Sequence, residues 1–476
     1  MNLSIIKICS IVLLFVAPVA LIYSNILEAP FVLDDTVRIQ DNPHIRMTDL
    51  SIKEIVKAGW NKESASKRPI GNMSFALNYY FHQYNLKGYH VVNIIIHIFA
   101  GFFLFLFIKT TLSILSIESK CDHPTLIAFF SALIWLVHPV QTQSVTYIVQ
   151  RLNSLAAMFY VLSFWLYVKG RLAQKKNASN SHPKKSSKGD PQPATWNHFL
   201  WFAGSVLAWI LALGCKQNAA TLPFFIVLYE WYFFQNLHKQ WFKRHLKYFL
   251  GIFILFLFIS LIYMGSDPWE KISSIGDYAK NEFTIKERAL SQFRVVIYYL
   301  SLIVFPHPSR LNLDYDFPLS HSLIDPITTL LSLCIIVGLL GLAIYMAKKE
   351  RVLSFCILWF LGNLVIESSV IPLAIIFEHR LYLPSMLVCL MVVIWIFRLL
   401  NQKWLGVALL CAVAMLFSFW TYERNSVWID KVTLWKDCVQ KSPNKARPHY
   451  NLGKALVARN RLSEAIDHYF MASRIN

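Results

Sequence analysis

The apolar stretch that decides the fold is Tyr89–Ile108, YHVVNIIIHIFAGFFLFLFI. It contains no Asp, Glu, Lys or Arg, and it has the length of roughly twenty residues that an α-helix needs to cross the apolar core of a bilayer. Further apolar runs lie at Ile5–Tyr23, Pro124–Val140, Leu152–Val168, Phe199–Leu213, Ala219–Phe234, Tyr248–Tyr263, Ile324–Met346, Val352–Ile366, Leu383–Leu400 and Leu405–Trp420. They exceed strand length and do not alternate, so we predict an all-α, polytopic membrane protein with about eleven transmembrane helices.

The composition agrees with this class of protein. Of all residues, 56% are hydrophobic and 15% are charged, and the mean hydropathy is +0.44. The net charge of +19 comes from basic residues that cluster in short loops between apolar runs. Because this placement is typical of cytoplasmic membrane flanks, we expect a lipid bilayer and no nucleic acid as a partner. The eight cysteines show neither zinc spacing nor a disulfide framework.

The basic loops also predict an orientation. Residues 170–197 contain five lysines among Ser, Asn and Pro, which indicates a flexible cytoplasmic loop. We therefore expect the N-terminus to be a retained anchor that starts inside, and residues 24–88 to form the first extracytoplasmic loop. This arrangement requires that Val295–Phe305 does not cross the membrane fully. Residues 1–421 then form the membrane domain, and its polar turns gather on the outer face.

Two adjacent carboxylates follow the first apolar run, in Phe31-Val-Leu-Asp-Asp-Thr36. If that run lies in lipid, Asp34 and Asp35 lie at a membrane surface. Paired acids at such a boundary can bind a cation, anchor a basic partner or act as a general base. The sequence indicates no certain cofactor, and a divalent cation held by the two aspartates stays an open alternative.

Polar side chains on the helix predicted from Tyr89 extend this outer region. His90, Asn93 and His97 are three and four residues apart, so they lie on one face of that helix. Polar groups within a span often connect helices by hydrogen bonds, and this is the simplest interpretation of His97. His90 and Asn93 lie nearer the outer surface, so we consider them candidate pocket residues.

Basic and polar residues mark the other outer turns. They are Arg68, Tyr80, His138, Arg151, Lys216, the run Glu378-His379-Arg380, and Tyr382. Some of these cations can simply extend to the interface, but three ionisable residues in a row at a membrane boundary are costly unless they are paired or liganded. Cations beside a carboxylate suit a reaction in which a lipid-borne phosphate leaves and a hydroxyl is deprotonated. The chain has neither a GxxxxGK[ST] loop nor an HExxH motif.

The C-terminal residues 422–476 differ in character, because they are polar and helical in period. Leu452, Gly453, Leu456, Ala465, Tyr469 and Ala472 match the small and large positions of a tetratricopeptide repeat. An ordinary helical hairpin is the alternative. Because a single repeat cannot bury its own face, we expect this segment to pack on the membrane domain or on a partner.

Taken in order, these motifs resemble the glycosyltransferase-C superfamily, and within it the transmembrane and tetratricopeptide-repeat protein O-mannosyltransferases and their prokaryotic relatives. The matching pieces are Phe31–Asp35 with Asn42-Pro43; Arg68-Pro69 with Asn78-Tyr79-Tyr80; Gly88–Asn93 with His97; His138–Val145 with Arg151; Lys216; and Glu378–Ser385. The C-terminal repeat completes the series, which covers nearly the whole chain.

The resemblance implies an inverting transfer of a sugar from a polyprenyl-phosphate donor to an acceptor hydroxyl outside the cytoplasm. By similarity, Asp34 is the base and Asp35 supports it. The residues expected to hold the donor phosphate are Arg151, Lys216, His379 and Arg380. Those expected to line the substrate pocket are Arg68, Tyr80, His90, Asn93, His138, Glu378 and Tyr382.

Several alternatives stay open at this point. We expect Ser or Thr of exported proteins as the acceptor, mannose as one option for the sugar, and a role for the repeat in acceptor binding. A lipid or cell-envelope glycan is a second class of acceptor. A transporter or scaffold without enzymatic activity is a third hypothesis, which requires polar residues near mid-membrane and inverted repeats. The short loops and compact tail favour a prokaryotic cytoplasmic membrane, with the C-terminal repeat outside.

Overall fold

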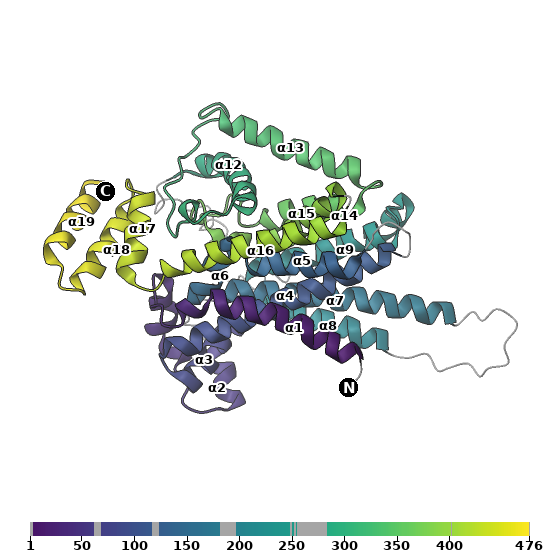
Figure 1. The fold of residues 1–476 in the computed structure, drawn as a ribbon, viewed down its shortest axis with the longest axis horizontal. Coiled ribbons are helices and arrows are strands. Elements are labelled where there is room, and N and C mark those ends of the chain that lie inside the picture. The colour runs from purple at the N-terminus through teal and green to yellow at the C-terminus, as the bar shows by residue number, and fades with distance from the viewer. Residues whose placement is uncertain are drawn as a thin grey trace, which may run out of the picture. The chain divides into compact units, whose positions relative to one another are not determined.

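The computed structural model of the chain describes residues 3–60, 68–116, 123–180, 197–247, 250–251, 254, 283–400 and 402–475. Over these residues it contains helices and turns and no strand, which confirms the all-α prediction (Figure 1). The chain divides into two compact units. Unit 1 consists of Met1–Leu222, Leu302–Asp316 and Glu378–Asn476, and unit 2 consists of Pro223–Ser301 and Phe317–Phe377.

Unit 1 is a bundle of long apolar helices with shorter polar helices at its end. Its helices are α1 (Leu3–Ile22), α2 (Ile52–Gly59), α3 (Pro69–His82), α4 (Leu86–Ser116), α5 (Pro124–Leu136), α6 (Thr142–Thr146), α7 (Arg151–Asn180), α8 (Asn197–Leu213), α15 (Ser385–Leu399), α16 (Lys403–Ser426), α17 (Lys431–Lys441), α18 (Ala446–Val457) and α19 (Leu462–Ile475). α4 packs against α5 and α7, and α7 packs against α8 (Figure 1). α16 packs against α1 and α5, so residues from both ends of the chain share one bundle.

Unit 2 contains α9 (Leu222–Tyr229), α12 (Ile285–Val304), α13 (Thr328–Met346) and α14 (Arg351–Leu364), of which α9 and α12 cross the unit boundary by a few residues. The buried Arg288 of α12 donates hydrogen bonds to the carbonyl oxygens of Glu367 at 3.0 Å, Ser369 at 3.0 Å and Ala374 at 3.2 Å. These bonds hold the irregular segment that leads to the Glu378-His379-Arg380 run.

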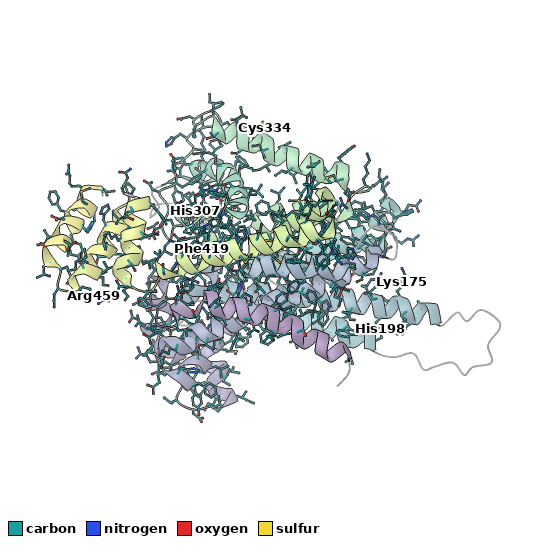
Figure 2. All side chains as sticks on the ribbon, viewed as in Figure 1. Lys175, His198, His307, Cys334, Phe419 and Arg459 are labelled. Atoms are coloured by element: carbon teal, nitrogen blue, oxygen red, sulfur yellow. The ribbon has the colours of Figure 1, made fainter. Side chains whose placement is uncertain are left out.

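Four helices of the described chain are long and apolar enough to cross a membrane, namely Leu86–Leu115, Ile148–Ala178, Thr328–Met346 and Lys403–Ser426. A fifth span is possible if Pro124–Leu136 and Pro139–Thr146, which meet at a bend of 53°, count as one broken helix. Side chains such as Phe419 on α16 point outward from these helices, as expected for a surface that faces lipid (Figure 2). The chain is therefore a multi-pass membrane protein.

The predicted number of eleven spans is too high for the helices that the structure describes. Four of the predicted runs correspond to apolar helices that are too short, at Ser10–Ile22, His198–Leu213, Arg351–Leu364 and Ser385–Leu399. The run Ala219–Phe234 is divided into a 3-10 helix, α9 and a π-helix, and most of Tyr248–Tyr263 lies outside the described residues. Hydropathy measures apolar length, whereas a span also needs an unbroken helix of about 30 Å.

The helix predicted near Val295 is longer than expected, because it begins at Ile285. Its first turns contain Glu287 and Arg288, and it is absent from the spans identified in the described chain. The C-terminal segment forms the three helices α17, α18 and α19, with α18 packed on α19. Its helical character matches the sequence, and its identity as a tetratricopeptide repeat stays a prediction.

Close packing of α4 on α5 generates a prediction about stability. A Cβ added at Gly101 of α4 would come within 2.5 Å of the Leu136 side chain on α5. We expect Gly101→Val to reduce the free energy of unfolding by about 1–3 kcal/mol, because overpacking displaces well-packed neighbours. Thermal unfolding of the purified protein in detergent measures the effect. Gly338→Val is the matched control, since nothing lies within 4 Å of a Cβ at Gly338 on α13. Equal losses for both variants would contradict the described packing.

Candidate active site

The two acids after α1 have different environments. Asp35 is fully buried, and its carboxyl oxygens accept hydrogen bonds from the backbone N–H groups of Val32 at 2.9 Å and Val149 at 2.7 Å. Asp34 is exposed, and its carboxylate has no hydrogen-bond or ion-pair partner among the described residues. The turn that contains both acids therefore holds Asp35 in the core and leaves Asp34 exposed at the surface.

The backbone at Leu33 produces this separation. Its φ angle of 44° lies in the left-handed region, which costs a non-glycine residue about 1–2 kcal/mol. On one side of Leu33, the backbone N–H of Asp34 donates to the phenol oxygen of Tyr147 at 2.9 Å. On the other side, the backbone N–H of Val32 donates to the Asp35 carboxyl group, which also accepts from Val149. Strain of this kind persists only where surrounding contacts determine the conformation, and here those contacts determine where Asp34 projects.

Burial also changes the pKa of the inner acid. Burial raises the pKa of Asp35 to about 8, although its hydrogen bonds from Val32 and Val149 lower it. Because it is fully buried and both of its oxygens are bonded to the backbone, Asp35 is part of the framework of the turn. Asp34 is the carboxylate that is available for proton transfer. Among the described residues no group of three or more His, Cys, Asp or Glu side chains could hold a metal ion.

Arg151, expected on the donor phosphate, lies in the core of unit 1. Its side chain is fully buried and donates to the amide oxygens of Asn93 at 2.7 Å and Asn78 at 2.6 Å. It also donates to the carbonyl oxygens of Tyr89 at 3.0 Å and Ser74 at 3.3 Å. These bonds join α3, α4 and the start of α7, so Arg151 stabilises the framework and does not project into an open site.

Four basic or potentially basic side chains gather elsewhere in unit 1. Arg68, Lys216 and Arg380 all act electrostatically on His379, which is 9% exposed. Arg68 meets the turn before Lys216 because the backbone N–H of Ile70 donates to the Gly214 carbonyl at 3.0 Å. A Cβ at Gly214 would come within 2.4 Å of Ile70, so glycine permits this approach. We call Arg68, Lys216, His379 and Arg380 the cationic cluster.

Two amide side chains hold the centre of the cationic cluster. The Oε1 atom of Gln143 accepts from the backbone N–H of His379 at 2.8 Å and from its ring Nδ1 at 3.1 Å. Asn153 donates to the His379 carbonyl at 2.7 Å and accepts from Lys216 Nζ at 2.9 Å. Since a backbone N–H can only donate, the orientation of the Gln143 amide is fixed, and the Nδ1 atom of His379 must carry a proton.

The charge state of His379 follows from its surroundings. Burial lowers its pKa well below the ordinary value, and the charges of Lys216, Arg380 and Arg68 lower it further. The ring is therefore neutral at pH 7, with Nδ1–H directed at Gln143 and the lone pair on Nε2. His379 therefore adds no fourth positive charge to those of Arg68, Lys216 and Arg380.

The two parts of the site depend on the same short segment, Gln143–Asn153. Its residues Tyr147 and Val149 bind the Asp34–Asp35 turn, and its terminal residues Gln143 and Asn153 bind His379. Sequence reasoning selected Arg151 in this segment and included Gln143 in the motif His138–Val145, but it missed Tyr147, Val149 and Asn153. Amide and phenol groups in and beside apolar helices were the available signal, but their partners are distant in the sequence.

The remaining predicted pocket residues have mainly internal partners. Glu378 is buried and accepts from the Asn312 backbone N–H at 2.5 Å and the Tyr315 hydroxyl at 2.6 Å. Tyr382 contacts His97 Nδ1 at 2.8 Å. His90 Nε2 donates to the Ala29 carbonyl, His138 Nε2 donates to the Ile303 carbonyl, and Asn93 binds Arg151. Tyr80 is 36% exposed and its ring contacts Phe81, so these residues do not form one pocket lining.

The fold and the site define a multi-pass membrane protein with an open carboxylate and a separate cationic cluster on one framework. The chain is 24% identical to a protein O-mannosyl-transferase of Caenorhabditis elegans, over 95% of this chain and 61% of that relative. It is 23% identical to Protein O-mannosyl-transferase Tmtc3 of Drosophila melanogaster, over 95% of this chain and 54% of that protein. It is 24% identical to Protein O-mannosyl-transferase TMTC1 of Homo sapiens, over 96% of this chain and 54% of that protein.

The ordered motifs predicted a resemblance to protein O-mannosyltransferases, and these relatives, which carry that name, confirm it. The chain spans between about half and three fifths of the length of these curated relatives. No protein-family description matches it, and no solved structure matches it.

Removing the buried Arg151 guanidinium tests the framework. We expect Arg151→Gln to reduce the free energy of unfolding by about 3–5 kcal/mol, because the amide and carbonyl oxygens around it lose their donors inside the core. Chemical unfolding in detergent measures the loss. Arg459→Gln is the control, since Arg459 pairs with Asp430 at 2.7 Å with its side chain 65% exposed (Figure 2), and such pairs contribute about 0–1 kcal/mol. Similar losses in the two variants would refute the anchoring role.

Proposed function

We propose that this chain is a glycosyltransferase that moves a sugar from a polyprenyl-phosphate donor to a Ser or Thr hydroxyl of exported proteins. The observation that supports it most is the pairing of an open carboxylate with a cationic cluster on one rigid segment. Asp34 has no side-chain partner among the described residues, while Tyr147 and Val149 fix its turn. The same segment fixes His379 between three cations through Gln143 and Asn153.

The reaction needs both features. The Asp34 carboxylate takes the proton of the acceptor hydroxyl as its oxygen attacks the anomeric carbon of the sugar. The bond from that carbon to the phosphate oxygen breaks, and its electron pair leaves with the polyprenyl phosphate. Attack opposite to the leaving group inverts the anomeric configuration. Cations are placed where the negative charge of the leaving group develops, which stabilises the transition state more than the ground state.

The environments favour distinct roles for the residues. Arg68, Lys216 and Arg380 bind the phosphate oxygens, because guanidinium and ammonium groups are strong phosphate donors. Asp35 and Arg151 act as positioning residues, since both are fully buried and bonded to the framework.

The acceptor and the topology complete the proposal. The names of the relatives support a protein acceptor and mannose as the sugar. We propose residues 1–421 as the membrane domain and residues 422–476 as a repeat segment outside the cytoplasm that contributes to acceptor binding. The loop 24–88, which contains Asp34, then lies on the same outer face, and residues 170–197 lie inside.

Mass spectrometry of exported proteins from a deletion strain tests the acceptor. Unchanged protein masses with an altered envelope glycan favour a glycan acceptor.

Replacing the proposed base tests the mechanism. We expect Asp34→Asn to reduce sugar transfer by about 10²–10⁴-fold, the usual contribution of a general base, with an unchanged melting temperature. The melting temperature is expected to stay constant because the carboxylate has no side-chain partner among the described residues. Transfer from a polyprenyl-phosphate sugar to a Ser/Thr peptide in detergent is the assay. Asp49→Asn, an exposed acid in the same outer segment, is the control. Full activity of a folded Asp34→Asn protein would remove the base assignment.

A charge change in the cationic cluster tests the donor assignment. We expect Arg380→Gln to raise the KM for the polyprenyl-phosphate sugar by about tenfold or more, because a charge-assisted bond to phosphate is lost. Arg380→Lys should recover part of this loss, since it retains the charge without the planar fork. The KM for the peptide is the internal reference. Arg398→Gln, at an exposed position in the last turn of α15, should leave both values unchanged.

A further inference from the structure

Glu378, the residue directly before His379 and Arg380, has a set of partners that the transfer reaction does not use. Its Oε1 atom accepts from the Asn312 backbone N–H at 2.5 Å and from the Tyr315 hydroxyl at 2.6 Å. Both donors belong to residues 308–316, which we call the bridging segment. Because Glu378 is buried, its carboxylate depends on these donors and on nearby positive charge.

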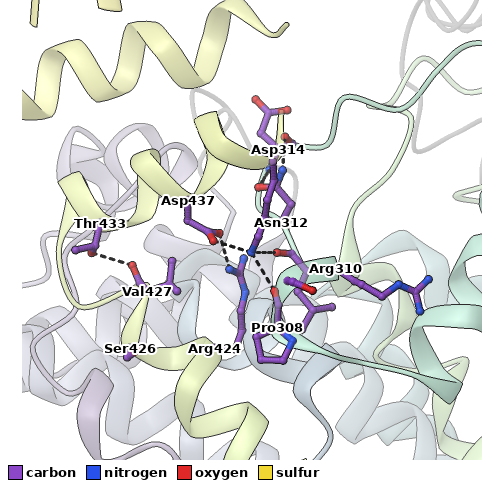
Figure 3. Close-up of polar contacts among 12 residues, drawn as sticks. Pro308, Arg310, Asn312, Asp314, Arg424, Ser426, Val427, Thr433 and Asp437 are labelled. Carbon is purple, nitrogen blue, oxygen red and sulfur yellow. Dashed lines mark hydrogen bonds and ion pairs between the residues drawn. The ribbon is translucent and has the colours of Figure 1, made fainter. Parts of the chain in front are cut away.

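The bridging segment is in turn held by the C-terminal helices. Lys441, at the end of α17, donates to the carbonyl oxygens of Pro308 at 2.9 Å and Leu311 at 2.8 Å. Lys441 and the buried Arg424 of α16 both bind Asp437 of α17, at 2.6 Å and 2.7 Å. Figure 3 shows Arg424 extending from α16 to Asp437 beside Pro308. The first half of the bridging segment is thus attached to α16 and α17.

Ser442 fixes the second half of the bridging segment. Its buried hydroxyl donates to the Asp314 carbonyl at 2.8 Å. It accepts from the Asn312 amide at 2.9 Å and from the Asp316 backbone N–H at 2.9 Å. One hydroxyl therefore makes three bonds to the segment that carries both donors of Glu378.

Two cations complete this attachment. The buried Asp314 carboxylate binds Lys445 at 2.9 Å and Arg447 at 2.5 Å. Burial alone would raise the pKa of Asp314, but the bonds and charges of Arg447 and Lys445 hold it below the ordinary value. Asp314 is therefore ionised at neutral pH, and the pairing is of the partly buried, charge-assisted kind that contributes more than a surface pair.

We propose that the C-terminal segment is a positioning element of the active site, which acts through the bridging segment and Glu378 on His379 and Arg380. Ser442 and Asp314 are its main positioning residues. The inference rests on the proposed function only in assigning the donor phosphate to the cationic cluster. It implies that any partner that displaces α17 or the turn after it loosens the cluster, and so reduces donor binding without contacting the donor.

The test combines two readouts on the full-length protein in detergent. Ser442→Ala and Asp314→Asn are compared with the original protein by hydrogen–deuterium exchange at residues 378–382 and by binding of farnesyl phosphate, a short polyprenyl phosphate. We expect faster exchange at 378–382 and about five- to tenfold weaker binding in both variants, because each leaves buried groups without partners. The KM for the acceptor peptide should not change. Arg461→Ala, which removes an exposed pair with Glu464 on α19, is the matched control in the same segment and should change neither readout.

A double-mutant cycle with Glu378→Gln identifies the route. If Ser442 acts through Glu378, Ser442→Ala should weaken farnesyl phosphate binding much less in the Glu378→Gln background than in the original protein. Equal, additive losses overturn the proposal, as do unchanged exchange and binding in Ser442→Ala and Asp314→Asn. An original protein that fails to bind farnesyl phosphate refutes the proposed function instead, and the exchange measurement then still decides whether the C-terminal segment holds residues 378–382.

Discussion

The rest of the structure depends on a buried guanidinium with neutral partners. Burying a charge costs several kcal/mol unless its hydrogen bonds are replaced, and Arg151 is fully buried. The amide oxygens of Asn78 and Asn93 and two backbone carbonyls replace the water that it loses. Because these partners come from α3 and α4, and Arg151 itself begins α7, the charge holds three helices in one arrangement. The segment Gln143–Asn153, which passes through this point, is thereby immobilised.

That segment separates opposite charges that would otherwise neutralise each other. Val149 binds the buried acid Asp35 and Tyr147 fixes the backbone of Asp34, so the open carboxylate stays at its own turn. Gln143 and Asn153 fix His379 at the other end, among the cations. A direct salt bridge between Asp34 and Arg380 would remove both the proposed base and the proposed phosphate site. Preorganised separation of this kind is what allows a site to stabilise charge that appears only during the reaction.

The sequence predicted the helical class and the membrane location, because both follow from the length of the apolar runs. It could not predict which partners the buried ionisable residues have. Arg151 and Arg380 look equivalent as basic residues at span ends, yet one is bonded to two asparagines and the other belongs to the cationic cluster. It also overestimated the number of spans, because hydropathy does not register breaks in a helix. One 3-10 helix begins after Lys216 and a π-helix begins at Glu230, so the residues from Gln217 to Phe234 form short helices and not one span. Partners as distant as Gln143 and His379, or Asn312 and Glu378, have no local signature.

The bend of 53° between α5 and the Pro139–Thr146 helix explains why so many polar groups gather at this depth. Irregular backbone is tolerated in a membrane protein only where it is buried in protein or lines a polar cavity. Gln141, Thr142, Gln143 and Ser144 are all buried in this turn, and each has a side-chain polar atom without a partner among the residues that the structure describes. Each such group costs about 1–3 kcal/mol when nothing satisfies it, so a purely structural turn would favour apolar side chains here. The bend therefore brings amide and hydroxyl groups from four consecutive residues into the core of unit 1, including Gln143, which binds His379.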